Sequence, residues 1–79
     1  MATILFFGRL RDAVGTNALA ATLPDDVRDT DAVRSWLGSD HPALCDPSVR
    51  IAVNAEMTAA NRAVGDGDEI AFLPPMSGG

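Results

Sequence analysis

The most reactive feature of this sequence is its last pair of residues, Gly78-Gly79, which follows the run Leu73-Pro74-Pro75-Met76-Ser77. Glycine has no Cβ atom, so this pair can enter a narrow channel and adopt backbone angles closed to other residues. The two prolines fix φ at about −65° and stiffen the segment that leads to the end. We therefore expect residues 75–79 to form a flexible tail that presents the carboxylate of Gly79 as a reagent. The alternative is a frayed chain end, because most termini are poorly ordered.

Length and composition describe one small acidic domain. The chain has 79 residues, 47% of them hydrophobic and 22% charged, which is typical of a globular protein. We assign residues 1–74 to the folded domain. The net charge is −5, and each of the six basic residues is arginine. This balance lacks the basic stripe that nucleic-acid binding requires, and it suits a solvated acidic surface or a partner with a basic face.

A single cysteine, Cys45, excludes an internal disulfide and a cysteine metal cluster. The apolar run Ile4–Phe7 is far too short to span a membrane, and it lacks the basic flank and cleavage site of a signal peptide. We therefore expect a cytoplasmic protein that binds no metal and does not insert into a membrane.

The order of the expected elements predicts the fold. Val33, Trp36 and Leu37 form the apolar stripe of a helix that begins near Thr30. Asp29 or Thr30 is a candidate N-cap, and Gly38 can cap the other end. We expect Trp36 to be substantially covered by the sheet. Strands are expected at 2–7, 18–23, 49–53, near 57 and at 69–73, with a short helical segment at 9–14. One helix packed on one face of a mixed sheet gives an α+β domain, and a β-grasp roll best suits this order.

The alternation of side chains along the strands predicts an open apolar face. If Ile4, Phe6, Ile51, Val53, Ile70 and Phe72 face the helix, then Leu5, Phe7 and Leu73 lie on the uncovered side, where Met57 joins them. An apolar cluster that leads straight into the tail is typical of a docking surface.

Catalytic constellations are weak in this chain. His41 and Cys45 lie four residues apart in a proline-flanked loop, which is poor evidence for a nucleophile and its base. The acidic residues at 25–31 and 66–69 lack the ligand spacing of a calcium loop, so helix caps and turns explain them better. We therefore do not expect the chain to be catalytic alone.

The sequence resembles the ubiquitin-like sulfur carriers, and within them the MoaD family of small subunits of molybdopterin synthase. The matching segments run along essentially the whole length, and the C-terminal fourteen residues are the most specific. They are Leu5-Phe6-Phe7, Leu10-Arg11-Asp12, Gly15, Ala52-Val53-Asn54 and the run from Asp66 to Gly79.

The resemblance implies a β-grasp fold and a carrier role. An E1-like adenylating enzyme (MoeB-like) would use ATP to activate Gly79, and a persulfide-derived sulfur would then give a thiocarboxylate. The large subunit of molybdopterin synthase (MoaE-like) would take up the tail and pass the sulfur to a cyclic pyranopterin monophosphate. No cofactor would be bound permanently. The resemblance assigns the reactive end to Gly78 and Gly79 and the partner surface to Phe7, Arg11, Met57, Leu73, Pro74, Pro75 and Met76.

Three other functions remain open from the sequence. A sulfur carrier of the thiamine pathway has the same fold and the same Gly-Gly end, although it typically lacks the Phe-x-x-Leu-Arg run and the Pro-Pro pair. A ubiquitin-like protein modifier would form the same adenylate and end on a target lysine. A structural interaction module would keep its function when Gly78-Gly79 is deleted.

Overall fold

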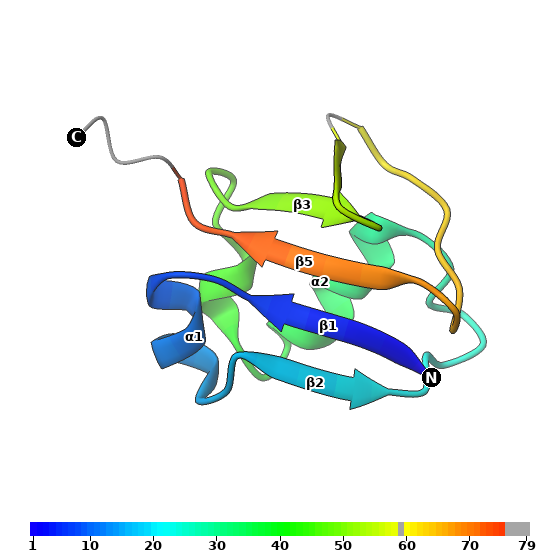
Figure 1. Cartoon of the computed structure of the whole chain (residues 1–79), viewed down its shortest axis with the longest axis horizontal. Helices are drawn as coiled ribbons and strands as arrows, with labels where there is room; N and C mark the ends of the chain where they lie inside the picture. Colours follow the sequence, from blue (N-terminus) through cyan, green and yellow to red (C-terminus); the bar gives the residue numbers. More distant parts are fainter. Residues whose placement is uncertain (59, 76–79) are drawn as a thin grey trace.

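The fold is built on one mixed five-stranded sheet with a single main helix against one of its faces (Figure 1). The computed structural model describes residues 1–58 and 60–75. The strand order in the sheet is β2-β1-β5-β3-β4. Its strands are β1 (Ala2–Phe6), β2 (Ala18–Ala21), β3 (Arg50–Val53), β4 (Glu56–Thr58) and β5 (Glu69–Leu73). Two helices, α1 (Arg9–Val14) and α2 (Thr30–Gly38), and one short 3-10 helix, η1 (Pro42–Cys45), complete the described part. The expected β-grasp architecture is confirmed.

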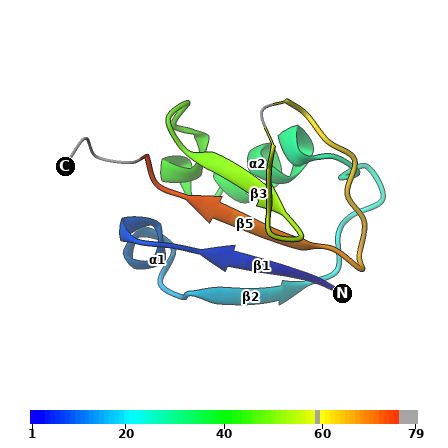
Figure 2. The same cartoon turned by 45° about the horizontal axis from the view of Figure 1, so that its top comes forward.

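The centre of the sheet is a parallel pair, and this pair places the root of the tail. Strands β1 and β5 run side by side in the same direction, with Ile4 opposite Ile70 and Phe6 opposite Phe72, while the other neighbouring strands are antiparallel. Because both strands end at the same edge, the backbone N–H of Phe7 donates to the carbonyl oxygen of Phe72 at 3.1 Å. The described end of the chain therefore leaves the sheet beside α1, at the opposite end from the amino terminus (Figures 1 and 2).

Helix α2 begins where the sequence predicted. The carboxylate of Asp29 accepts a hydrogen bond from the backbone N–H of Ala32 at 2.8 Å, which is the geometry of an N-cap. Val33 and Leu37 are buried against the sheet. Trp36 packs against the same core but is only partly buried. The sheet therefore covers this side chain less than the sequence analysis predicted.

The end of α2 differs from the expectation for Gly38. This glycine is the last helical residue, and Ser39, in a right-handed helical conformation, occupies the cap position. Gly38 is buried, and a Cβ atom there would collide with the sulfur of Cys45. The close approach of the Cys45 side chain therefore favours glycine at this position, and the expected cap at Gly38 is not formed.

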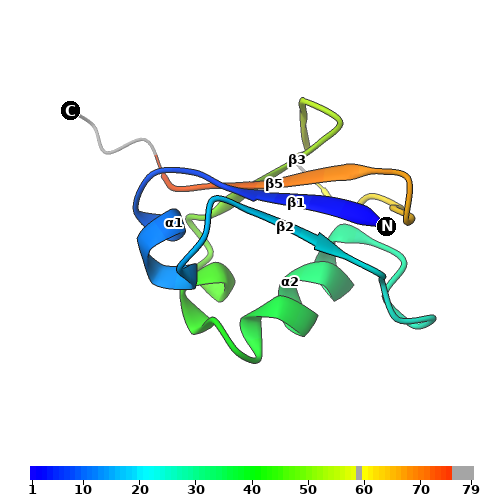
Figure 3. The same ribbon diagram turned by 60° about the horizontal axis from the view of Figure 1, so that its bottom comes forward.

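The core lies between the sheet and α2, and the other face of the sheet is uncovered (Figure 3). All six residues expected on the helix side, Ile4, Phe6, Ile51, Val53, Ile70 and Phe72, are buried. The rings of Phe6 and Phe72 stack with their centroids 5.8 Å apart. Within the described residues, no helix has the length and apolar character needed to cross a membrane.

Candidate docking surface at the root of the tail

Gly8, which follows β1, lies close to Pro74 at the root of the tail. Gly8 has φ of +57°, in the left-handed region that favours glycine, and a Cβ atom there would lie 2.8 Å from Cγ of Pro74. This contact joins residues from the two ends of the chain. The sequence gives no local signal for this contact, because it depends on the pairing of β1 with β5.

Replacing Gly8 tests how much this contact contributes. We expect Gly8→Ala to lower the free energy of unfolding by about 1–3 kcal/mol, because it adds backbone strain and displaces Pro74. Gly15→Ala is the matched control, since Gly15 also has positive φ (+95°) but no atom within 4 Å of an added Cβ. Urea unfolding gives the stability of both variants. The backbone amide of Phe7 donates to Phe72, and its hydrogen exchange should accelerate more in Gly8→Ala than in Gly15→Ala. Equal exchange rates in the two variants would mean that the Gly8–Pro74 contact does not stabilise this end of the sheet.

An apolar row crosses the open face of the sheet. The strand register makes five residues successive neighbours across the sheet: Ala18 on β2, Leu5 on β1, Ala71 on β5, Ala52 on β3 and Met57 on β4. Residues that are directly opposite in register project to the same face. The two central alanines are buried although no helix covers them, so the middle of the row is built of small side chains between Leu5 and Met57.

Two large residues of this face are accessible to solvent. Phe7 is 46% exposed and Met57 is 52% exposed, whereas Leu5 and Leu73 are half-buried. We call Leu5, Phe7, Met57 and Leu73 the docking surface. The alternation predicted from the sequence is confirmed for these residues, while their contact with a partner stays a prediction.

The structure locates the remaining candidate residues in part. Arg11 is exposed on α1, and Pro74 and Pro75 are half-buried at the tail root. Met76, Gly78 and Gly79 lie outside the described residues, so the expected boundary of the tail at residue 75 stays a prediction.

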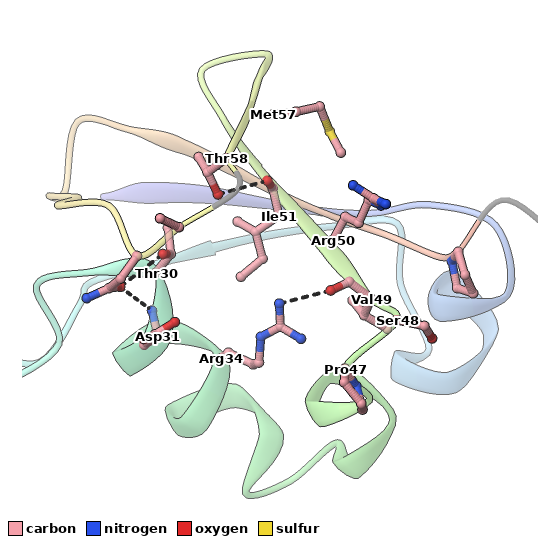
Figure 4. Close-up of a pocket in the computed structure, with 13 residues that line it drawn as sticks. Thr30, Asp31, Arg34, Pro47, Ser48, Val49, Arg50, Ile51, Met57 and Thr58 are labelled. Carbon is pink, nitrogen blue, oxygen red and sulfur yellow. Dashed lines mark hydrogen bonds between the residues drawn. The ribbon is translucent and has the colours of Figure 1, made fainter.

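A groove between α2 and the β3–β4 edge begins where the tail leaves the sheet, since Pro75 and Arg50 both line it. Figure 4 shows the guanidinium of Arg34 pointing across this groove to the carbonyl oxygen of Val49. Arg34 also donates to the carbonyl oxygens of Leu44 and Asp46 at 3.3 and 3.1 Å. Its hydrogen bonds therefore tie α2 to the segment that precedes β3, which is a structural role.

The other candidate groups form no active centre in the described part of the chain. The thiol of Cys45 donates to the carbonyl oxygen of Arg34 at 3.8 Å, and no hydrogen bond joins it to His41. Asp29 caps α2, and Asp25 forms an exposed ion pair with Arg28. No group of three potential metal ligands is found among the described residues.

The acidic turn before β5 is likewise structural. Asp66 accepts a hydrogen bond from the backbone N–H of Leu23 at 2.9 Å. Asp68 accepts one from the side-chain amide of Asn54 and one from the backbone N–H of Gly65, and these bonds lower the pKa of its carboxyl group. A carboxylate that is stabilised in this way fixes the turn and is poorly suited to proton transfer near neutral pH.

Comparison with known proteins gives matches along the whole chain. The ThiS family matches residues 4–79. The molybdopterin synthase sulfur carrier subunit of Haemophilus influenzae is 36% identical over 83 residues, and that of Escherichia coli is 38% identical over 85 residues; each match covers 100% of both chains.

Solved structures support the same fold. The solution structure of small archaeal modifier protein 1 from Methanosarcina acetivorans has a TM-score of 0.76 and 26% identity, covering 99% of this chain and 95% of that one. A putative molybdopterin converting factor, subunit 1, from Pyrococcus furiosus has a TM-score of 0.78 at 21% identity, covering 95% and 97%. From these matches, the chain belongs to the ThiS family and, within it, to the MoaD family of molybdopterin synthase sulfur carrier subunits.

Proposed function

We propose that this protein carries sulfur for molybdopterin synthesis and that its functional group is the carboxylate of Gly79. The full-length similarity to two sulfur carrier subunits supports the proposal. The observation that carries it is the placement of the tail root, which the Gly8–Pro74 contact holds beside Phe7 and Leu73 of the docking surface. A partner that covers these side chains can receive the tail in the same encounter.

The chemistry begins with activation, because a carboxylate is a poor electrophile. An E1-like adenylating enzyme (MoeB-like) joins the Gly79 carboxylate to the α-phosphate of ATP and releases pyrophosphate. A persulfide sulfur then attacks the acyl carbon, the bond to the phosphate oxygen breaks, and AMP leaves. A second thiol attacks the donor sulfur of the resulting acyl disulfide, forms a disulfide with the donor and leaves the thiocarboxylate on Gly79.

The proposed partner that accepts the tail is the large subunit of molybdopterin synthase (MoaE-like). There the thiocarboxylate sulfur attacks the cyclic pyranopterin monophosphate and forms a thioester. Water cleaves the acyl–sulfur bond of this thioester and returns the carboxylate of Gly79, and a second carrier delivers the other sulfur of the dithiolene. Near the tail root, α1 and the start of β3 carry Arg9, Arg11 and Arg50, and arginine does not exchange protons at neutral pH. The one acidic residue of α1, Asp12, is exposed and makes no hydrogen bond or ion pair with the described residues of the tail root. We therefore assign the acid–base groups to the large subunit.

Intact mass spectrometry tests the proposal. The purified chain, incubated with ATP, an activating enzyme and a sulfur donor, should gain the mass difference between one sulfur and one oxygen atom. Omitting ATP is the control and should leave the mass unchanged. An unchanged mass in the complete mixture, with pyrophosphate release shown for a known carrier, would rule out the thiocarboxylate mechanism.

Protein modification is the second candidate, supported by the similarity to small archaeal modifier protein 1. A modifier would join Gly79 to lysine amines of other proteins and give a ladder of high-mass conjugates. A sulfur carrier would give a free thiocarboxylate that restores molybdopterin synthesis when mixed with the large subunit. Restored thiazole synthesis without molybdopterin synthesis would assign the chain to the thiamine pathway.

A further inference from the structure

The basic residues of this chain are chemically uniform. All six are arginine, so the sequence contains no primary amine apart from the α-amino group. An activated carboxyl at Gly79 is an acylating group, and a primary amine is a nucleophile that would convert it into an amide. A guanidinium stays protonated in proteins and does not attack an acyl carbon. The chain therefore carries positive charge on side chains that cannot consume its own activated end.

Two of these arginines lie beside the root of the tail. Arg9 begins α1 directly after Gly8, which lies close to Pro74. Arg50 begins β3 opposite Leu73 in the strand register. Both arginines are exposed, and within the described residues neither side chain forms a hydrogen bond or an ion pair. A change at either position therefore disturbs no contact of the fold.

The length of the tail brings these positions within reach of the activated carboxyl. Four residues follow Pro75, and four residues span at most about 14 Å. The Cα atoms of opposite residues in an antiparallel pair, such as Arg50 and Leu73, lie about 4.5–5.5 Å apart. The serine and the glycines of the tail are residue types that favour turns. A long side chain at position 50 can therefore meet the carbonyl carbon of Gly79.

The α-amino group is separated from the activated carboxyl by the fold. Thr3 lies opposite Glu69, at the start of β5, so the amino terminus lies at the far end of the sheet (Figure 1). Between Glu69 and Pro75 the chain advances by about 20 Å at the usual rise of a strand. The four residues after Pro75 span less than this, so the carboxyl cannot reach the α-amino group of its own molecule.

We propose that Arg9 and Arg50 determine the chemical specificity of the activated end, because they place positive charge within its reach and offer no amine. The acyl adenylate then survives until the sulfur donor attacks it. A lysine at either position would attack the acyl carbon, expel AMP, lose a proton and form an amide with Gly79. The proposal rests on the proposed function, which supplies the activated carboxyl.

A thioester of Gly79 with a small thiol, made on the full chain by intein cleavage, tests the proposal without an activating enzyme. The wild-type thioester should only hydrolyse. Arg50→Lys should form an internal amide, lighter than the hydrolysed chain by one water, at least about 10-fold faster than the wild type. Free thiol in the buffer reverses any exchange with Cys45, so only an amide accumulates. Intact mass spectrometry follows the reaction, and fragmentation locates the new bond.

Arg28→Lys is the matched control, because it makes the same substitution at the far end of the sheet. There the carbonyl oxygen of Arg28 accepts from the backbone N–H of Val64, beside the turn before β5. This variant should hydrolyse as the wild type does. An internal amide in the wild type, equal amide formation in Arg28→Lys, or none in Arg50→Lys would each overturn the proposal. Because the thioester is made chemically, a failure of sulfur transfer with the activating enzyme would count against the proposed function alone.

Discussion

Adding one residue after Gly79, or deleting Gly79, should yield a folded protein that supports no sulfur transfer. The new terminus would lie about 3.3–3.6 Å too far along the partner's channel or too far back. Misplacement of a reacting group on this scale costs about a hundredfold or more in rate. The buried core ends at Phe72, so neither change removes a core side chain.

The measurement is molybdopterin formation by the reconstituted synthase, with circular dichroism and thermal melting as tests of folding. One residue added before Met1 is the matched control, because the amino terminus lies at the opposite end of the sheet from the tail root (Figure 1). Gly78→Ala should be intermediate or worse, since its Cβ must fit where the tail is most confined. Full activity of a C-terminally extended chain, shown by mass to be unprocessed, would force the carrier mechanism to be abandoned.

Truncating Phe7 to alanine should weaken binding to the large subunit by about 1–3 kcal/mol, as loss of an aromatic interface anchor commonly does. Its side chain is 46% exposed on the open face, so the melting temperature should change comparatively little. Calorimetric titration against the large subunit and a thermal melt measure the two effects separately.

Leu19→Ala is the control for Phe7→Ala. Leu19 is a large apolar residue, 37% exposed on the edge strand β2, and it lies outside the docking surface. Its truncation should leave the affinity unchanged. A large loss of stability with unchanged affinity in Phe7→Ala would place this residue in the core and remove it from the interface.

Local patterns in the sequence determined the elements and their faces. Alternation along residues 2–7 and 49–53 is a property of each segment alone, because successive side chains of a strand point to opposite sides. It therefore predicted that Phe6 is buried and that Phe7 is exposed. The start of α2 also followed from local chemistry, since a cap such as Asp29 acts within one turn. The tail itself was recognised from residue types, because its chemistry needs only prolines, glycines and a carboxylate.

Only the tertiary structure decided which distant residues meet. The contact between Gly8 and Pro74 depends on the parallel pairing of β1 and β5, and no local pattern encodes it. The collision that excludes a side chain at Gly38 likewise depends on where η1 folds back. Each residue's type is local, but its partners and its place in the electric field of the molecule are set by chain segments far away in sequence.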